Sequence, residues 1–568
     1  MRTTLLLAPL LLASFAYYFS SCVSLHAQDI SLRPIISGNI SLSADYYTLN
    51  TEPAPFFAPR RPANLYRLVA QSNIQYGIIE LPVTLMLSSQ QTNVSTGFAV
   101  NQSLEQFLQN PLNIIAIEPR IGALQAHLGS YTPQYSSLTA GDVQIFGLGA
   151  DFKPGRLTAS AFYGVAQRAI EPTFPITSFN LTGAYQRTMK GAQFGVSSAG
   201  GSTVSFQVVH AIDDTSSVQT QLTTVTPQEL FVGSVAAKIN IDSTIIADAE
   251  IASNFTTRSL RAQLYQGSDF SSFSPITVRN STRLDYAATA GVAFLLGPVK
   301  LRTGAKYIGE GFASPGFPYL QPDRIEFTVQ PAFTTTDNLL NISGTVGYRI
   351  NNVLSTQTAT LSQLLISANG LWVMSNDWSV AATLSNFGVR NTASNDTLRI
   401  ENVSRSISVS PMYSFSTSFG MQTVTLTAGY DSYDDYNVIS GALSDNSVLS
   451  TFANYSVVLS TMPLTGYGGI SYVSNSLKFG GYTTFSANAG SSYNLAALKL
   501  RPGLRLTYSS SSFTGGGSNT QFLVGVSCGY TISGTTVLSL NATLNSFSFS
   551  TNSSYSESTI QALISTRF

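Results

Sequence analysis

The chain ends in the stretch Glu557-Ser-Thr-Ile-Gln-Ala-Leu-Ile-Ser-Thr-Arg-Phe568. The residues at every second position back from Phe568 suit hydrocarbon and are Thr566, Ile564, Ala562 and Ile560. The positions between them are polar except for Leu563. A period of two sends successive side chains to opposite sides of a β-strand. The stretch therefore predicts a strand with one face toward hydrocarbon and the other toward water.

The composition extends this interpretation to the whole chain. Of the 568 residues, 10% are charged and the formal net charge is zero, whereas a soluble protein carries about 25% charged residues. No stretch after residue 27 has the 18 or more consecutive apolar residues of a membrane-spanning helix. Low charge without such helices predicts an all-β chain with a wet face and a hydrocarbon face. The neutral balance also argues against a nucleic-acid partner.

The amino terminus has the form of a targeting segment. Residues 1–27 carry an early Arg2, an apolar run from Leu5 to Phe19 and a small residue, Ala27, at a plausible cleavage site. We interpret 1–27 as a signal peptide and 28–568 as one barrel domain. Lipoprotein processing at Cys22 is the alternative. Cleavage after Ala27 leaves Cys528 as a single cysteine, which forms no internal disulfide.

Alternating strands recur from Ile36 onward, and the links between them alternate in length. Short links rich in Gly, Pro, Asn and Asp alternate with long ones at roughly 93–111, 168–183, 213–228, 257–282, 310–323, 391–402 and 432–449. A short link near Asn475 is the exception. Outer-membrane barrels have short turns at one end and long loops at the other. The chain is therefore predicted to be a single large antiparallel transmembrane β-barrel of about 26 strands (about 22 to 30), without a plug domain and with both termini in the periplasm. A stack of soluble sandwich domains would need linkers, which the sequence lacks.

Several segments resemble a group of outer-membrane β-barrel proteins of Bacteroidota and Chlorobi-type bacteria. The clearest are Tyr135-Ser-Ser-Leu-Thr-Ala-Gly-Asp142, Gly147-Leu-Gly-Ala-Asp-Phe-Lys-Pro-Gly-Arg156 and Phe162-Tyr-Gly164. The ending on Phe568 resembles the final strand of bacterial outer-membrane barrels, which closes the barrel and is read by the barrel-assembly machinery. In that comparison Ile560, Ala562, Ile564 and Phe568 form the insertion signal. The resemblance implies an architecture and a compartment, and no catalytic residue.

The two tryptophans flank a short turn at Ser375–Asp377. Trp372 and Trp378 share a face with the apolar residues of their strands, which is where an aromatic girdle lies at a membrane boundary. Two core tryptophans of a soluble sandwich are the alternative.

The chain offers little for catalysis. His127 is expected to face the lumen, and His210 to lie at the outer rim of the lipid face. The run His210-Ala-Ile-Asp-Asp214 places acids near a histidine at a generic spacing. The Gly515–Gly517 run opens no helix and predicts no phosphate site. Asp431, Asp434 and Asp435 crowd a predicted loop, where solvated charge is favoured over a calcium site. We therefore predict no enzyme activity, no cofactor and no metal.

Basic residues gather on the wet face just after short turns. Those predicted to give the lumen its basic character are Arg156, Lys238, Lys300, Arg302, Lys499 and Arg501. Lys238 is expected to pair with Asp248 across the turn at Asp242. A ring of bases at a pore mouth favours anions, although rim charges can also simply mark the membrane edge.

Together these observations predict an exported outer-membrane barrel that gives small solutes a porin-like passage through a polar, slightly basic lumen. The alternative is a non-conducting barrel that anchors or secretes surface proteins. A barrel this wide would leak if empty, so loops or a partner protein are expected to occlude it. The expected partners are the lipid bilayer and, through the C-terminal strand, the barrel-assembly machinery.

Overall fold

The computed structural model describes residues 34–53, 59–89, 113–141, 143–171, 183–219, 225–267, 271–317, 319–478, 480–551 and 553–568. The predicted signal peptide, 1–27, lies outside them, as does Cys22.

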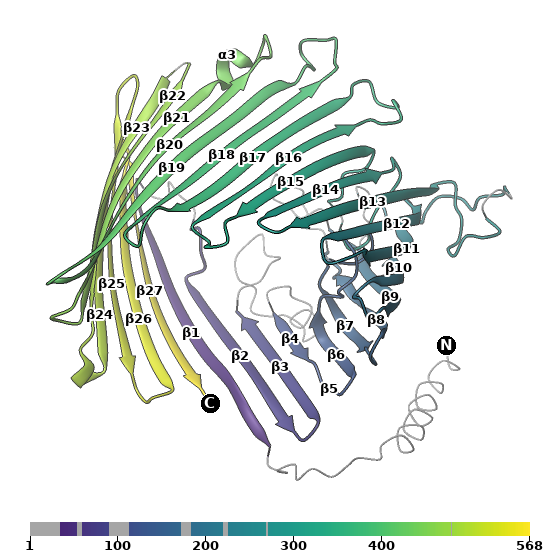
Figure 1. Ribbon diagram of the computed structural model, residues 1–568, viewed down its shortest axis with the longest axis horizontal. Coiled ribbons are helices and arrows are strands. Elements are labelled where there is room, and N and C mark those ends of the chain that lie inside the picture. The colour runs from purple at the N-terminus through teal and green to yellow at the C-terminus, as the bar shows by residue number, and fades with distance from the viewer. Residues whose placement is uncertain are drawn as a thin grey trace.

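The described chain consists almost entirely of strands (Figure 1). Those of the first half are β1(Ile35–Glu52), β2(Asn64–Tyr76), β3(Ile79–Ser88), β4(Ile114–Ile117), β5(Arg120–Ile121), β6(Leu124–Tyr131), β7(Ile145–Phe152), β8(Leu157–Gln167), β9(Gln186–Ser197), β10(Thr203–Asp214), β11(Glu229–Asn240), β12(Ile245–Thr257), β13(Thr282–Leu296) and β14(Val299–Ile308).

Those of the second half are β15(Arg324–Thr334), β16(Leu340–Asn351), β17(Leu361–Val373), β18(Trp378–Asn391), β19(Glu401–Thr417), β20(Gly420–Asp435), β21(Asn446–Leu459), β22(Leu464–Leu477), β23(Gly480–Tyr493), β24(Leu500–Phe513), β25(Ser518–Thr531), β26(Thr536–Ser548) and β27(Ser554–Arg567). Two short helical turns, α3(Gly441–Ser444) and η1(Ala496–Leu498), lie in links. Among the described residues, no helix has the length and apolar character that crossing a membrane requires.

The strands form one closed antiparallel barrel. Apart from the short β4 and β5, each strand pairs with its neighbours in sequence, and β1 also pairs with β27, so the sheet has no open edge (Figure 1). The short segments β4 and β5 both lie between β3 and β6 and occupy a single strand position. The 27 segments therefore make a 26-strand barrel, which confirms the predicted architecture and strand number.

The closing seam is fully paired. Leu42, Ala44 and Tyr46 on β1 lie opposite Ile564, Ala562 and Ile560 on β27. Beyond the last ladder pair, the Phe568 N–H donates to the Gly38 carbonyl at 3.1 Å, and the Gly38 N–H donates to the Phe568 carbonyl at 3.0 Å. Closure matters because an open edge would leave backbone donors and acceptors without partners in the membrane.

The links separate into two ends. We call the end with residues 35 and 568 the terminus end and the opposite one the loop end. Terminus-end links are tight: the Asp242 side chain, for example, accepts hydrogen bonds from the Thr244 and Ile245 amides, each at 2.7 Å. Most loop-end links are longer, but those after β22 and β24 are short. The sequence predicts the first of these two, near Asn475. Two further long links, between β6 and β7 and between β16 and β17, are absent from the predicted set.

Each strand has an apolar face and a polar face, as its alternation predicts. On β1, Leu42 and Tyr46 are about half exposed on the outer face, whereas Asp45 lies on the inner face. Hydroxyls on the inner face pair across neighbouring strands, at 2.7–2.9 Å, as Thr383–Ser408, Ser410–Thr427 and Thr484–Ser511. Such cross-strand pairs each stabilise a sheet by roughly 0.2–1 kcal/mol. The serines and threonines of the inner face therefore have a structural role.

Candidate functional site

Two loop-end links fold back against the inner wall of the barrel. We call residues 132–141, 309–317 and 319–323, from the β6–β7 and β14–β15 links, the inner shelf. The two parts are joined to each other: the Gly316 N–H donates to the Thr139 carbonyl at 2.9 Å, and the Ser314 Oγ donates to the same oxygen at 2.9 Å. Ser314 and Thr139 are 175 positions apart in the chain.

The approach of the two parts requires glycine at position 316. A Cβ built on Gly316 would lie 2.2 Å from the Ala140 Cα, far inside van der Waals contact. A larger residue would push the two parts of the shelf apart.

Polar side chains of the wall hold the shelf in place. The Gln207 Oε1 on β10 accepts from the Ser136 N–H at 3.0 Å and from the Thr139 Oγ1 at 2.8 Å. The Ser136 Oγ donates to the Glu250 carboxylate at 2.5 Å. The Asp285 carboxylate accepts from the Gly311 N–H at 2.5 Å. Buried polar groups satisfied in this way fix a segment in one conformation, because breaking each bond leaves a donor or acceptor unpaired.

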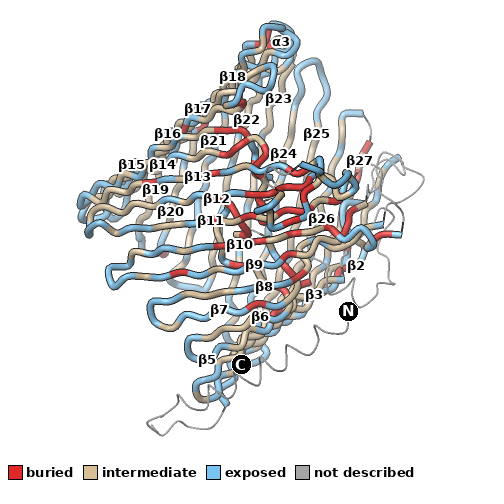
Figure 2. The backbone as a smooth tube through the Cα atoms, turned by 90° about the vertical axis from the view of Figure 1, so that its right-hand side faces the viewer, coloured by how far each residue is buried: buried red, intermediate tan, exposed pale blue. Residues whose placement is uncertain are grey.

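Apolar contacts hold the shelf as well. Leu138 is fully buried in a cluster with Phe312 and Leu320 of the shelf and with wall residues Val232, Ala252, Ala287 and Ile308. Burying one leucine contributes about 1.5–3 kcal/mol. Ala140 packs in a second cluster with Ile145, Phe162, Met189, Val209 and Ala211. Figure 2 shows the buried residues gathering along β9 to β13.

The Tyr135 side chain anchors one margin of the shelf. Its hydroxyl donates to the Ser160 carbonyl at 3.2 Å and accepts from the Ser160 Oγ at 3.1 Å. Its ring meets Phe162 edge-on, with centroids 5.3 Å apart. Burial raises the pKa of Tyr135 to about 12, so the phenol stays protonated and keeps both hydrogen bonds at neutral pH.

The wet-face charges are partly paired. Lys238 lies opposite Asp248 in the register, as the sequence predicts. The cation that reaches the Asp248 carboxylate, however, is Arg302, with its Nη2 2.8 Å from Oδ1. Farther along the wall, the Arg349 Nη2 lies 3.0 Å from the Glu326 carboxylate. The predicted Lys238–Asp248 ion pair is therefore replaced by a pair that spans three strands.

The remaining predicted bases lie toward the terminus end. Lys300 and Arg302 line a hollow of about 500 Å³ together with Gln330. Arg501 lies on β24, and Arg156 in the turn before β8. Lys499 is not on a strand as predicted: it follows η1 with a left-handed φ of 53°. Within the described residues, Arg156, Lys238, Lys300, Lys499 and Arg501 form no ion pair.

Both histidines in the described part of the chain, His127 and His210, lie beside carboxylates. The His127 Nδ1 lies 3.1 Å from Glu118 and its Nε2 3.5 Å from Asp151. The acid beside His210 is Glu229, at 2.9 Å from Nε2, and not Asp213, which binds Arg187 at 2.7 Å. With both ring nitrogens of His127 facing carboxylates, neither is placed to take a proton from a hydroxyl nucleophile.

The acidic cluster differs from its prediction. Asp431, Asp434 and Asp435 lie on β20 and not in a loop. The Asp434 carboxylate lies 2.5 Å from the Arg405 Nη1, while Asp435 accepts from the hydroxyls of Ser440 and Ser444 at 2.7 Å. Alternation along a strand divides neighbouring acids between two faces, so these three do not converge on one ion.

The tryptophans lie on the outer face near the terminus end. Trp372 and Trp378 are 51% and 46% exposed. Trp378 stacks on Tyr413 with centroids 4.6 Å apart, and Tyr413 stacks on Phe415 at 5.0 Å.

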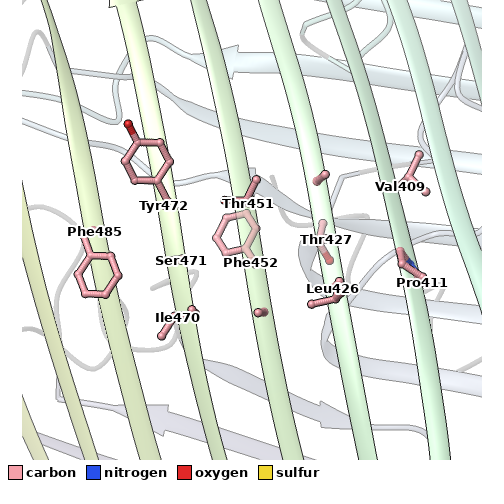
Figure 3. Close-up of a pocket in the computed structure, with 12 residues that line it drawn as sticks. Val409, Pro411, Leu426, Thr427, Thr451, Phe452, Ile470, Ser471, Tyr472 and Phe485 are labelled. Atoms are coloured by element: carbon pink, nitrogen blue, oxygen red, sulfur yellow. The ribbon is translucent and has the colours of Figure 1, made fainter.

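A groove of about 470 Å³ also lies on the outer face, across β19 to β23 (Figure 3). It is bordered by Val409, Leu426, Ile470 and Phe485, with Ala428 and Ala453 among its smaller lining residues. Because these residues belong to the apolar face, the groove faces hydrocarbon and is not part of a solute path.

Sequence reasoning missed the inner shelf, although a signal for it was present. On β8 to β13, the alternate positions that face the lumen carry apolar residues near the loop end, including Phe162, Met189, Val209 and Val232. Apolar residues on both faces of a strand indicate that something covers the inner face. Residues 135–141 of the segment that carries the resemblance belong to the first part of the shelf.

Comparisons with known proteins give the following. No family model matches the chain, and no curated protein matches it. Among solved structures, the Pseudomonas aeruginosa OccK10 (OpdN) structure has a TM-score of 0.35 and 12% identity, covering 66% of this chain and 98% of that one. OpdK of the same organism, solved with vanillate, has a TM-score of 0.27 and 12% identity, covering 94% and 99%.

An Escherichia coli P pilus tip assembly intermediate, PapC-PapD-PapK-PapG, has a TM-score of 0.44 and 10% identity, covering 94% of this chain and 62% of the matched one. At these values the likeness carries no argument about function. The kinship to a Bacteroidota-type group stays a prediction.

Proposed function

We propose that the protein is a passive outer-membrane channel for small hydrophilic solutes, narrowed from within by the inner shelf. One observation carries the proposal: a closed barrel with an apolar outer face and a hydroxyl-rich inner face holds a folded partial constriction made from its own links. A barrel of 26 strands is far wider than its wall side chains can fill. The shelf reduces this lumen on one side and leaves the wall of β15 to β27 uncovered by described shelf residues.

Location follows from the same features. A strand barrel with an apolar belt fits a bilayer, and barrels of this kind occur in outer membranes. We propose that residues 1–27 direct export and are removed, and that the strand with Ile560, Ala562, Ile564 and Phe568 is read by the barrel-assembly machinery. Trp372 and Trp378 then mark the membrane boundary at the terminus end, as aromatic girdles do.

The lumen is proposed to favour anions weakly. Arg156, Lys300, Lys499 and Arg501 carry positive charge toward the terminus end without an ion-pair partner in the described chain. Carboxylates in the turns at Asp242, Asp337 and Asp377 lie at the same end and reduce the effect. Rings of charge at a pore mouth select against ions of the same sign.

Single-channel recording in planar bilayers tests the channel. The purified protein is expected to give discrete conductance steps, and its reversal potential in a KCl gradient to lie on the chloride side of zero. Absence of conductance from protein that shows heat-modifiable mobility would overturn the proposal. A cation-side reversal potential would overturn the selectivity alone.

The shelf is tested by Gly316→Ala. The added Cβ should separate the two parts of the shelf and give a larger or more fluctuating conductance than the wild type. Gly534→Ala is the matched control, because a Cβ at Gly534 meets no atom within 4 Å. Equal conductance of all three proteins would show that the shelf does not limit the pore.

A second candidate function, an anchor for a surface protein, is favoured by an apolar patch at the loop end. Leu398, Val438 and Leu443 are 64%, 75% and 71% exposed there. The Asn437 Nδ2 joins their two links by donating to the Asp396 carbonyl at 2.7 Å and to the Arg399 carbonyl at 2.5 Å. A rigid exposed apolar patch typically marks an interaction site. The two functions differ in conductance, which the anchor does not require.

A further inference from the structure

A second polar cavity lies on the inner side of the closing seam. It has a volume of about 450 Å³ and is built by β1, β2, β26 and β27 together with the link after β1. Its lining includes Asp45, Arg60, Arg61, Arg67, Asn541 and Gln561. The cavity is on a different part of the wall from the shelf, which packs on β7 to β14. Its charges are not part of the predicted basic set.

Arg60 lies at one margin of this seam cavity and contacts Tyr555 and Glu557. Its Nη2 donates to the Tyr555 hydroxyl at 3.1 Å, and its guanidinium lies 5.2 Å from the centroid of the Tyr555 ring. Its Nε lies 3.8 Å from the Glu557 carboxylate, which also accepts from the Tyr47 hydroxyl at 2.8 Å. The charges of Arg60 and Glu557 therefore offset each other and fix the link over the seam.

The other charges of the cavity are not offset in this way. Arg61, Arg67 and Asp45 form no ion pair within the described residues. Two guanidinium groups against one carboxylate leave the cavity with a single excess positive charge. A guanidinium presents a planar fork of donors that matches a carboxylate in two parallel hydrogen bonds. A monoanion would balance the excess charge, whereas a dianion would exceed it and also face Asp45.

The neutral lining adds hydrogen-bonding groups suited to hydroxyls. Thr543 and Thr559 hydrogen-bond to each other through their hydroxyls. The Asn541 Nδ2 donates to the Gln561 Oε1 at 3.4 Å, a long bond that leaves the Asn541 Oδ1 and the Gln561 amide group available. Each amide group has both donor and acceptor capacity. Such a lining can exchange hydrogen bonds with the hydroxyls of a sugar-like ligand.

We infer that the seam cavity is a binding subsite for a small hydroxylated monocarboxylate of the sugar-acid class. Arg61 and Arg67 bind the carboxylate, and Asn541 and Gln561 bind hydroxyls of the same molecule. This assignment adds a substrate class to the proposed channel, but binding to the cavity does not require that the barrel conducts.

The test is isothermal titration calorimetry of the full-length barrel in detergent with sodium glucuronate, glucose and inorganic phosphate. Glucuronate is expected to bind more tightly than either of the others. In the double variant Arg61→Gln/Arg67→Gln its affinity should fall at least about tenfold, as expected for the loss of charge-assisted hydrogen bonds. The control Arg302→Gln removes an inner-wall arginine outside the cavity and should leave binding unchanged.

Each contrary result overturns a stated part of the inference. If glucose binds as tightly as glucuronate, the arginines do not bind the carboxylate. If phosphate binds more tightly than glucuronate, the monocarboxylate assignment is overturned. No binding of glucuronate, or an equal loss in Arg302→Gln, would overturn the subsite. Heat-modifiable mobility of every variant establishes folding. If conductance is absent while glucuronate binds, the channel function fails and the subsite stands.

A second variant separates the two halves of the proposed ligand. Asn541→Leu should weaken glucuronate binding while leaving the binding of acetate, which has no hydroxyl, unchanged. If the affinities for glucuronate and acetate fall equally, Asn541 does not bind hydroxyls and the sugar-acid assignment is overturned.

Discussion

Asp248 on β12 and Arg302 on β14 meet across the strand that separates them, with Oδ1 and Nη2 2.8 Å apart. Gly291 of β13 lies beneath the pair: a Cβ there would come within 3.0 Å of the Asp248 Oδ1 and 3.1 Å of the Arg302 Nη2. The absence of a side chain at Gly291 lets the two charges meet. The contact removes one positive charge from the effective field of the lumen.

Replacing Asp248 by asparagine should release that charge. In Asp248→Asn, Arg302 loses its ionic partner, and the reversal potential in a KCl gradient should move farther toward the chloride equilibrium. Asp396→Asn, at the loop end, makes the same charge change away from this pair and serves as the control. A shift toward cations in Asp248→Asn would contradict the assignment of Arg302 to the conducting path.

Gln207 is expected to determine how firmly the shelf is held. In Gln207→Leu the Ser136 N–H and the Thr139 hydroxyl lose their shared acceptor, and a buried donor without a partner costs about 1–3 kcal/mol. Hydrogen exchange in residues 132–141 should accelerate while exchange in distant strands stays constant. Gln521→Leu, which removes a 2.8 Å bond to Asn545 elsewhere on the wall, is the control. Unchanged exchange at the shelf would mean that its apolar contacts suffice.

Gly38 controls closure of the seam. A Cβ there would lie 2.3 Å from the Gln71 carbonyl oxygen and 3.0 Å from the Phe568 ring. Overpacking of this kind costs about 1–3 kcal/mol, so Gly38→Val should reduce the fraction of protein with heat-modifiable mobility. Gly200→Val, where the nearest atom to a Cβ is the Ser198 Oγ at 3.8 Å, should have a smaller effect. The reverse order would show that the seam tolerates a side chain at this position.

The two tryptophans allow the membrane boundary to be measured. In the single-tryptophan variants Trp372→Phe and Trp378→Phe, the remaining indole should be quenched most by lipids brominated near the headgroup. Quenching by bromine at the acyl-chain end, or by aqueous iodide alone, would place the indole elsewhere. The stack on Tyr413 predicts a further loss of about 0.5–1.5 kcal/mol of stability in Trp378→Ala.

The turn at Asp242 should make its hairpin sensitive to acid. Hydrogen bonds from the Thr244 hydroxyl and from the Thr244 and Ile245 amides lower the pKa of Asp242. Because the folded pKa lies below the unfolded value of about 3.9, the stabilisation is present above that value and is lost as the pH falls through the folded pKa. The difference in urea midpoint between wild type and Asp242→Ala should therefore be larger at pH 6 than in strong acid. A constant difference would show that the charged form is not preferred.

The barrel was predictable because its determinants repeat. Alternation of apolar and polar residues sets the two faces of every strand, and link length separates the two ends of the barrel. The start of β1 and the end of β27 could therefore be placed at the same end from the sequence alone. The shelf was not predictable in the same way, because its position depends on Leu138 meeting Val232 and on Ser314 meeting Thr139, contacts between distant segments.

The same limit explains the smaller errors. The alternation of residues correctly placed Lys238 opposite Asp248. Arg302 reaches that carboxylate instead, because Gly291 on the strand between them has no side chain, and the pairing of two neighbouring strands does not reveal this. Lys499 departs from its predicted strand because η1 precedes it in the link. Asp431, Asp434 and Asp435 have a loop-like composition, yet β20 extends through them, supported by pairing with β19 and β21.

The pairing of β1 with β27 also sets the order of events in folding. Local hairpins can form as soon as their two strands exist, whereas this ladder joins the two extremes of the chain, as the Tyr47–Glu557 bond, spanning 510 positions, illustrates. Contacts of such sequence separation carry the largest loop-closure entropy and form slowly. Until the last strand arrives, both edges remain exposed to pairing with other chains. A chain that stays longer in that open state has more time to aggregate through its unpaired edges.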